Sequence, residues 1–365
     1  MKSARRGLLI AASLLLAIGV AMVYSSSAIY AQETYGDGAF FLKRHLIYLA
    51  LGLLAFGAAL SVEPGRLRQW AKPGMILTLF LLMMVLIPGL GHRVSGARRW
   101  FRLGGFSFQP SEMAQLMIIL YLADVMTRKR TLLQDFFKGV LPALTVLGLT
   151  VVLVVVEPDL GTAVATAVVA LLILFIAGVR WQILLPMLLS AIPAVIALVL
   201  TKPYRMRRIL AYLNPWADPE GSGFQLIQSL VALGSGGLFG VGLGESRQKL
   251  FYLPAAHTDF IFSVIGEEMG FLGTTFVLIL LALLLWFGLR VALSSPDTFG
   301  VLTGLGILLL LGLEALVHIG VSTGAIPTKG LPMPFVSYGG TALIVNLMSL
   351  GVLLNVARPV KVKAA

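Results

Sequence analysis

The sequence predicts an all-α fold: a polytopic integral membrane protein with about ten transmembrane helices and a long extracytoplasmic loop between helices seven and eight. Of the 365 residues, 58% are hydrophobic and only 12% are charged. Apolar runs long enough to cross a bilayer recur along the chain, and they are apolar on all sides rather than on one face. A soluble chain of this length would need far more charge to cover its surface. We therefore expect a single transmembrane domain over residues 1–365.

Composition also excludes several kinds of site. The chain has no cysteine, which rules out disulfides, thiolate metal sites and cysteine nucleophiles. Its histidines, His45, His92, His257 and His318, include no helical pair at metal-ligand spacing, which argues against a histidine zinc site. The net charge of +12 comes from cations that flank hydrophobic spans, so it indicates membrane topology and anionic headgroups rather than nucleic acid.

The expected helices are the apolar runs that satisfy the length criterion for a span. In order they cover residues 7–30, 46–62, 73–90, 110–125, 139–156, 160–179, 182–201, 260–293, 300–321 and 339–357. The first run looks like a signal peptide, but it is longer than a typical signal core and more spans follow, so we expect it to stay uncleaved. An even number of spans puts both chain ends on one side. Both ends are basic, the last with Arg358, Lys361 and Lys363, so we expect both termini in the cytoplasm.

With this orientation, the Lys and Arg residues divide almost evenly between the two sides of the membrane. Outer loops usually carry few cations, so their retention suggests that something polyanionic is held on the outer face. The alternative is that these side chains are solvated anchors among lipid headgroups.

Two acids stand where outer loops turn into helices. Glu112 follows Pro110 and Ser111, a combination that suits the first turn of a helix. Asp159 lies in the tight reversal Glu157-Pro158-Asp159-Leu160-Gly161-Thr162, where it could cap the next helix. For both residues a structural role and a functional role remain open.

The loop at residues 202–257 is long enough to suggest a function. It begins with the basic stretch Tyr204-Arg205-Met206-Arg207-Arg208 and turns through Asn214-Pro215-Trp216. Residues 224–233 have helical spacing with polar residues between apolar ones, which predicts an interfacial helix. The glycines at 234–244 predict a flexible or tightly turned segment. A phosphate-cradling loop is a weak reading, because no strand precedes them.

Asp259 sits where that loop ends and the apolar helix of residues 260–293 begins, in the run Gln248 to Phe262. A carboxylate at the boundary of water and lipid is costly and therefore a candidate functional group. It could instead cap the helix. Further along, Glu267 lies roughly 80° and Glu268 roughly 180° around the helix from Asp259, so both cannot share its face. We expect at least one of them to hydrogen-bond a neighbouring helix.

The last outer loop, Ile326 to Gly340, contains Pro327, Pro332 and Pro334. Prolines at this density make a stiff, non-helical segment, which suits a re-entrant segment buried in protein or facing a cavity.

Taken in order, these motifs resemble the SEDS family (shape, elongation, division and sporulation), and the likeness spans nearly the whole chain. The matching segments are Gly96–Trp100, Gln109–Glu112, Pro158–Thr162, Asn214–Trp216, Gln248–Phe262, Gly266–Glu268 and Pro327–Gly340. Residues 327–330 and 24–27 are more similar to the division members of the family than to its elongation members.

The resemblance implies a peptidoglycan glycosyltransferase that polymerises lipid II, the undecaprenyl-pyrophosphate-linked disaccharide peptide, on the outer face of the bacterial cytoplasmic membrane during division. It also implies a class B penicillin-binding protein transpeptidase and other division-complex membrane proteins as partners, and Asp259 as the essential aspartate. One departure is Gln115, which stands where the family usually has a lysine. A Glu–Lys pair with Glu112 therefore cannot be carried over: either Gln115 hydrogen-bonds Glu112 or another cation replaces the lysine.

The mechanism we expect is inverting. Asp259 would act as general base on the 4-hydroxyl of an acceptor sugar, which attacks the anomeric carbon of the donor. Cations would stabilise the departing pyrophosphate, and the candidates are Arg99, Arg205, Arg208 and Lys249. The other candidate substrate-binding residues are His257, Thr258, Lys329, Ser337, Glu112 and Asp159. No cofactor is certain. A divalent cation, Mg²⁺ or Mn²⁺, is possible with Asp159 or Glu112 as oxygen ligands.

Three rival functions stay open at this point. A transporter that flips lipid II would also be polytopic with buried acids. A non-catalytic scaffold for the division machinery and an elongation-type polymerase are the others.

Overall fold

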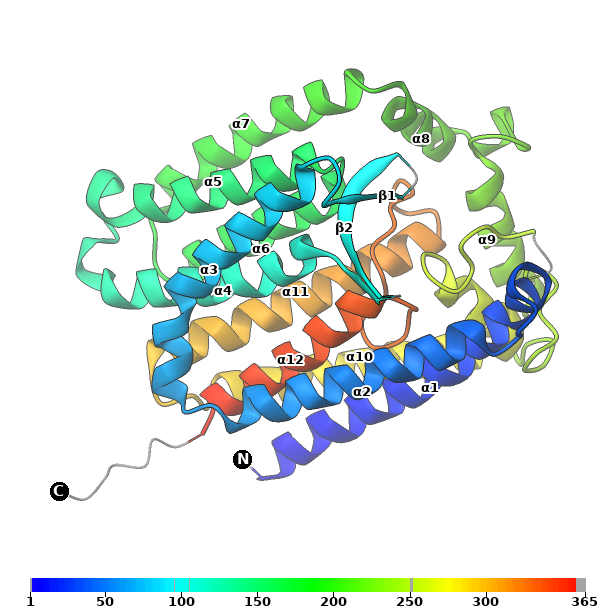
Figure 1. The fold of residues 1–365 in the computed structure, drawn as a ribbon, viewed down its shortest axis with the longest axis horizontal. Coiled ribbons are helices and arrows are strands. Elements are labelled where there is room, and N and C mark those ends of the chain that lie inside the picture. Colours follow the sequence, from blue (N-terminus) through cyan, green and yellow to red (C-terminus); the bar gives the residue numbers. More distant parts are fainter. Residues whose placement is uncertain (1, 95, 105, 250–251, 359–365) are drawn as a thin grey trace.

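The computed structural model describes residues 2–94, 96–104, 106–249 and 252–358 (Figure 1). The predicted positions Leu250, Phe251, Lys361 and Lys363 lie outside these residues. The α-helices are α1 (Lys2–Tyr35), α2 (Phe40–Ser61), α3 (Pro64–Leu86), α4 (Pro110–Arg128), α5 (Leu141–Val156), α6 (Leu160–Ile176), α7 (Trp181–Leu200), α8 (Pro203–Leu213), α9 (Phe224–Ser235), α10 (Ile261–Ala292), α11 (Thr298–Ser322) and α12 (Gly340–Val356). Short helical turns are η1 (Arg130–Leu132), η2 (Phe136–Val140) and η3 (Pro215–Ala217).

Each predicted span coincides with one of these helices, and the fold is helical and polytopic as expected. Among the described residues, seven helices are long and apolar enough to cross a membrane by length and composition. The helices α6 and α12 fall short of that criterion with 17 residues each. The helices α8 and α9 are the additional ones, and both belong to the long loop.

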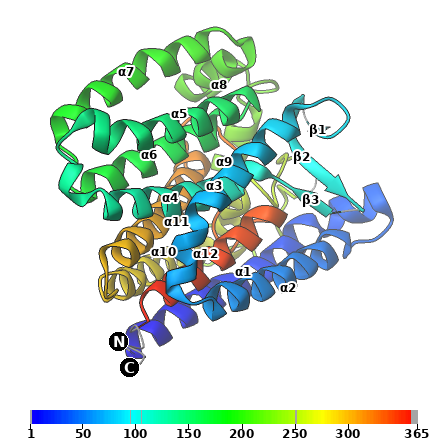
Figure 2. The same cartoon turned by 60° about the vertical axis from the view of Figure 1, so that its left-hand side comes forward.

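The helices pack side by side into a bundle, with α11 and α12 in its interior and α7 along one edge (Figures 1 and 2). Small residues let some backbones come close: a Cβ atom added at Gly351 of α12 would lie 2.6 Å from the carbonyl oxygen of Phe56 in α2. Asn355 of α12 donates to the carbonyl oxygen of Ala59 at 2.7 Å across the same contact. On α7 only Leu184 is buried, so most of that helix presents apolar side chains outward.

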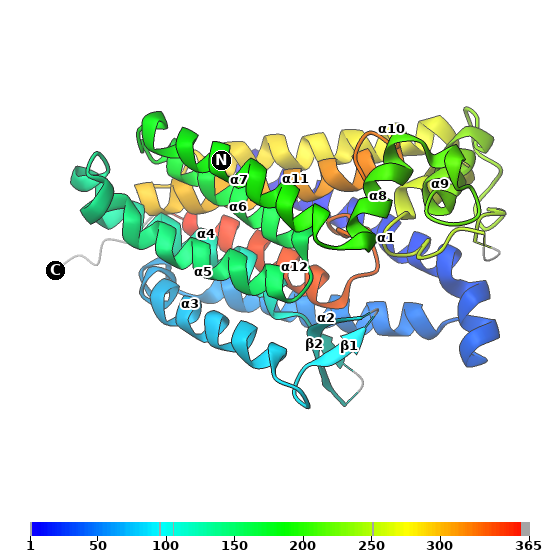
Figure 3. The ribbon, with the colours of Figure 1, turned by 90° about the horizontal axis from the view of Figure 1, so that it is seen from above.

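The two chain ends meet at one end of the bundle (Figure 1). There Arg5 donates to the carbonyl oxygen of Ala357 at 2.6 Å. Gly300, in the first turn of α11, is also at this end, because its Cβ position lies 3.0 Å from the carbonyl oxygen of Val356. The C-terminal end of α10 is at the same end, since α10 stops at Ala292, a few residues before α11 begins. The N-terminal end of α10 and the long loop with α8 and α9 therefore lie at the opposite end, which we call the site end (Figure 3).

A small antiparallel sheet at the site end was not predicted, and it adds three short strands to the expected helical fold. Its strands β1 (His92–Val94), β2 (Ala97–Leu103) and β3 (Phe106–Phe108) run in the order β1-β2-β3. Gly96 and Gly104, with φ of +82° and +53°, adopt the left-handed backbone that its two turns require.

A second departure from the sequence prediction is the break in α10 at Gly270, whose φ and ψ are 66° and −164°. The glycine segment 236–244 docks against this break. Val241 donates its backbone N–H to the carbonyl oxygen of Glu267 at 2.9 Å, and Phe271 donates to that of Gly237 at 2.9 Å. A Cβ atom at Gly270 would lie 2.3 Å from the backbone nitrogen of Gly240, so neither side has room for a side chain. The glycine segment is therefore tightly turned, and its N–H groups serve the backbone.

Candidate functional site

Asp259 ends a turn at the site end, just before α10 begins at Ile261. The backbone N–H groups of Thr258 and Asp259 both donate to the carbonyl oxygen of Ala255, at 3.1 Å and 3.0 Å. The N-cap position of α10 is Phe260, and no side chain caps it. Asp259 is therefore not the capping residue, which removes the main structural alternative for it.

The carboxylate of Asp259 lies against the loop before α12. A Cβ atom added at Gly330 would be 2.6 Å from one of its oxygens and 3.0 Å from its Cγ. Only a glycine lets this backbone come so close to the carboxylate.

Two hydrogen bonds fasten the same loop to the turn that carries Asp259. Ser337 donates its hydroxyl to the carbonyl oxygen of Thr258 at 2.8 Å, and Tyr338 donates its backbone N–H to that of His257 at 3.0 Å. The Ser337 hydroxyl also accepts from the backbone N–H of Met333 at 2.8 Å. With both roles used and the residue buried, Ser337 holds the loop in place.

Asp159 is the second carboxylate of the site. It accepts from Arg99 at 3.3 Å and from the amide of Gln109 at 3.1 Å, both on the same oxygen. Its other oxygen accepts the backbone N–H of Thr162 at 3.2 Å, so it also caps α6. The ammonium group of Lys329 is close by: it and an Asp159 oxygen each lie 3.7 Å from the Cβ position of Gly161. Asp159 therefore caps α6 and also lies close to the charged groups of Arg99 and Lys329.

Burial raises the pKa of the Asp259 carboxyl above its ordinary value. A hydrogen bond from Thr258 and the charges of Arg208 and Arg99 act in the opposite direction. Burial and the charge of Arg208 together lower the pKa of Lys329 to about 8, although the charge of Asp159 acts in the opposite direction. The site therefore contains a carboxylate of increased basicity beside a lysine that titrates not far above neutral pH.

The remaining cations differ in how far they are engaged. Arg208 donates to the carbonyl oxygen of Thr328 at 3.5 Å, and its charge reaches both Asp259 and Lys329. Arg205 is buried and donates to the carbonyl oxygen of Leu198 at 2.7 Å and to the Tyr204 hydroxyl at 2.9 Å. Arg205 therefore fixes the junction of α7 and α8.

His257 packs among aromatic rings, with its ring centroid 4.6 Å from that of Phe41 and 5.6 Å from that of Tyr338. Burial lowers the pKa of His257 to about 4, so the ring is neutral at pH 7. The hydroxyl of Thr258 donates to the carbonyl oxygen of Ala255 at 3.1 Å. These neighbours of Asp259 shape its turn.

Glu112 is buried on α4 and interacts electrostatically with Asp159 and Arg99. Both amide atoms of Gln115 are buried and have no hydrogen-bond partner among the described residues. Gln115 therefore does not hydrogen-bond Glu112 as one alternative had it, and Arg99 is a cation whose charge does reach Glu112. Behind Asp159, Glu157 is fully buried, and burial together with Asp159 raises its pKa to about 9.

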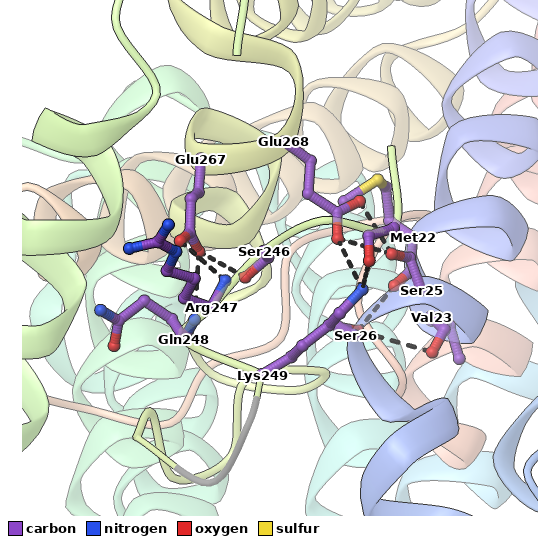
Figure 4. Close-up of polar contacts among 11 residues, drawn as sticks. Met22, Val23, Ser25, Ser26, Ser246, Arg247, Gln248, Lys249, Glu267 and Glu268 are labelled. Carbon is purple, nitrogen blue, oxygen red and sulfur yellow. Dashed lines mark hydrogen bonds and ion pairs between the residues drawn. The ribbon is translucent and has the colours of Figure 1, made fainter. Parts of the chain in front are cut away.

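Lys249 belongs to a second cluster, which lies around Glu267 and Glu268 in the part of α10 before the break at Gly270 (Figure 4). Its ammonium group pairs with Glu268 at 3.3 Å, where both side chains are almost completely buried. Glu268 also accepts the hydroxyl of Ser25 on α1 at 2.6 Å, which confirms the expected bond to a neighbouring helix.

The adjacent Glu267 holds the start of the loop that leads to Asp259. It accepts the hydroxyl of Ser246 and the backbone N–H groups of Arg247 at 2.9 Å and Gln248 at 3.4 Å (Figure 4). The two glutamates thus hold residues 246–249 against the first part of α10.

A metal centre has little support among the described residues. No group of three or more His, Cys, Asp or Glu side chains there could hold a metal ion. Asp159 already accepts from Arg99, Gln109 and the start of α6. Asp159 is therefore already engaged by three donors, and the proposed reaction uses no divalent cation.

Three residues of the site were missed by the sequence reasoning. Gln109 binds Asp159, and Gly330 lies against Asp259. Thr341 accepts the backbone N–H of Gln109 at 3.0 Å and donates to the carbonyl oxygen of Ser107 at 3.1 Å, which ties the sheet to α12. Gln109 and Gly330 lie in motifs already noted, and Thr341 directly follows one, so proximity to a motif was the available signal.

Known proteins resemble this chain over nearly its whole length. The family profile FtsW/RodA/SpoVE, described as "Cell cycle protein", matches residues 5–362. The probable peptidoglycan glycosyltransferase FtsW of Geobacter sp. (strain M18) is 48% identical over 349 residues, which cover 96% of this chain and 95% of that protein. Stage V sporulation protein E of Bacillus subtilis (strain 168) is 45% identical over 351 residues, which cover 96% of each chain.

Solved structures share the fold. A chain in a peptidoglycan synthase complex, described as coordinating polymerization and crosslinking, matches with a TM-score of 0.78 at 34% identity and 96% coverage of both chains. The rod shape determining protein RodA of Thermus thermophilus matches with a TM-score of 0.71 at 31% identity, over 96% of this chain and 95% of that one. The chain therefore belongs to the FtsW/RodA/SpoVE family of cell cycle proteins, the SEDS family that its sequence motifs resemble.

Proposed function

We propose that this protein is a peptidoglycan glycosyltransferase that polymerises lipid II into glycan strands. The observation that carries the proposal is a partly buried carboxylate, Asp259, with a raised pKa and the charges of Arg99 and Arg208 beside it. Relatives at 44–48% identity include several named peptidoglycan glycosyltransferase FtsW, which supports the same activity and a role in division rather than elongation.

In the proposed reaction, Asp259 accepts the proton of the acceptor's 4-hydroxyl as that oxygen attacks the anomeric carbon of the donor sugar. The bond from this carbon to the diphosphate oxygen breaks, and the product has inverted configuration. A base with a pKa nearer to neutral than an ordinary aspartate is better suited to this transfer. The role of the site's cations is to receive the negative charge that develops on the undecaprenyl diphosphate, and Arg99, Arg208 and Lys329 are placed for it.

The proposal includes an orientation. Counting α4, α6 and α12 with the seven long apolar helices of the described residues gives ten spans, an even number. With basic ends, both termini then lie in the cytoplasm and the site end lies outside. Supporting this, the start of α1 and the end of α12 lie together at the end of the bundle opposite to the N-terminal end of α10, which Asp259 precedes (Figure 1). The proposed partner is a class B penicillin-binding protein, by analogy with the solved complex that coordinates polymerization and crosslinking.

The test uses purified full-length protein with labelled lipid II in detergent, with and without the transpeptidase partner, analysed for glycan polymer. Polymer formed by the wild-type protein supports the proposal. Absence of polymer in both conditions, together with movement of labelled lipid II across vesicles that contain the protein, would support a transporter instead.

A further inference from the structure

Resting on the proposed function, we propose that a pocket next to Asp259 binds the peptide part of lipid II and makes the enzyme selective for peptide-bearing substrate. The pocket has a volume of about 420 Å³ at the site end. Its lining includes Arg207 and Arg208 of α8, Glu220 and Gln225 from the segment that follows α8, and Thr328. Nothing in the sequence prediction assigned Arg207 or Glu220 to the site.

The wall formed by α8 is held in place by residues on both sides of Arg207. Arg205 bonds back to Leu198, and Tyr212 donates its hydroxyl to the carbonyl oxygen of Ala325 at 3.2 Å. Arg207 itself is exposed; its charge acts on Asp218, but its side chain makes no hydrogen bond or ion pair within the part of the chain that the structure describes. Its guanidinium group is therefore available to a ligand.

The part of the lining that carries Glu220 is a preformed turn. Asp218 accepts the backbone N–H and the hydroxyl of Ser222 at 2.7 Å and 2.9 Å, and its carbonyl oxygen accepts the N–H of Gly223 at 3.0 Å. A Cβ atom at Gly223 would lie 2.0 Å from the carbonyl oxygen of Pro215, so the turn requires glycine there. Glu220 sits on a turn whose backbone is fixed before a ligand arrives.

The charges favour a peptide over the diphosphate as the occupant. Besides Arg208, which is proposed to face the diphosphate, Arg207 and Glu220 line the same pocket and offer a ligand both signs of charge. A purely anionic diphosphate would leave Glu220 without a cationic partner, whereas a peptide with carboxylates and an amine can satisfy both signs. A pocket of about 420 Å³ is also larger than a diphosphate requires and within the range for organic ligands.

The pocket is close enough to Asp259 for one substrate to reach both. Thr328 is two residues from Gly330, whose backbone lies against the Asp259 carboxylate. Two residues span at most about 7 Å of extended chain. A sugar placed at Asp259 can therefore keep its attached peptide in the pocket.

The experiment compares two substrates, lipid II with its complete peptide and the same lipid-linked disaccharide without peptide, using full-length protein in detergent. The variants are Arg207→Gln and Glu220→Gln, with Arg247→Gln as the matched control because it removes an exposed arginine elsewhere in the same loop. For Arg207→Gln we expect KM for the complete substrate to rise about tenfold, because one hydrogen bond to a charged group is lost. KM for the peptide-free substrate should not change. Glu220→Gln should raise KM for the complete substrate in the same way. When the amine of the peptide is acetylated, Glu220→Gln should no longer change KM, because the amine can no longer pair with Glu220.

Equal losses on both substrates would overturn the proposal, because they would indicate diphosphate contact or misfolding. Unchanged KM in both variants, or a wild-type protein that does not distinguish the substrates, would overturn it as well. Binding of the two lipids to Asp259→Asn separates this inference from the proposed function. Peptide-dependent binding that Arg207→Gln weakens would sustain the pocket even if no polymer ever forms.

Discussion

Replacing Gly330 with alanine would place a methyl group against the carboxylate of Asp259. The new Cβ atom would lie 2.6 Å from an Asp259 oxygen, whereas ordinary van der Waals contact begins at 3.4 Å. The carboxylate or the loop must therefore move by about 0.8 Å. The loop is fastened through Ser337 and Tyr338, so the side chain of Asp259 is the part expected to give way.

A displacement approaching 1 Å in a catalytic group can cost about 100-fold in rate. We therefore expect Gly330→Ala to lower kcat for lipid II polymerisation by roughly 10- to 100-fold, with little change in KM, because the base is misplaced while the substrate contacts remain. The assay is the initial rate of glycan formation at saturating lipid II, with melting temperature in detergent as the check on folding.

Gly339→Ala is the matched control. It lies in the same loop, and its added Cβ would meet its nearest neighbours at 3.4 Å, which is ordinary contact. This variant should keep nearly wild-type kcat. A Gly330→Ala protein with wild-type kcat would refute the reasoning that the position of Asp259 against this backbone limits the rate.

Three further predictions follow from the same contacts. The rate should fall as pH drops through the raised pKa of Asp259, because the protonated acid cannot act as base, and should fall again as pH rises through about 8, where Lys329 loses its charge. Lys329→Arg should abolish the alkaline fall, and a persisting fall would show that another group titrates there. Lys249→Met should destabilise the protein by about 3 kcal/mol, because it leaves the carboxylate of Glu268 buried without its cation. In thermal unfolding, the double variant Lys249→Met with Glu268→Gln should recover much of this lost stability. A double variant as unstable as the single one would contradict the pairing. Ser337→Ala should lower kcat about tenfold while Ser337→Thr, which keeps the hydroxyl, should restore part of it, and equal activity of both variants would remove the hydroxyl from the positioning of the Asp259 turn.

The sequence was sufficient for the ten expected spans because each is a long apolar run, and that signal does not depend on neighbours. It was insufficient for the break at Gly270, because Glu267, Glu268 and a glycine within the run are also compatible with a continuous helix. The break depends on the backbone of the segment 236–244, which approaches from another part of the chain. The sheet was missed for a related reason: its strands are three to seven residues long, too short for a clear alternating pattern.

For the functional site, too, some features could be predicted from the sequence and others could not. Asp259, Asp159 and Arg99 stand in motifs at the ends of predicted helices, and the structure brings their charges together. Distance along the chain could not reveal that Lys249 pairs with Glu268, or that Arg205 is occupied by Leu198 and Tyr204. A basic residue in a loop looks the same in sequence whether it faces substrate or a buried partner.

The most direct test of the central claim is the rate of glycan polymerisation by Asp259→Asn, measured with purified folded protein on lipid II. Asparagine keeps the size of the side chain and removes its basicity, so the claim predicts a loss of about 100- to 10,000-fold, the usual contribution of a general base. The account predicts that the variant still binds lipid II with near wild-type affinity. An Asp259→Asn protein that polymerises lipid II at the wild-type rate would contradict it.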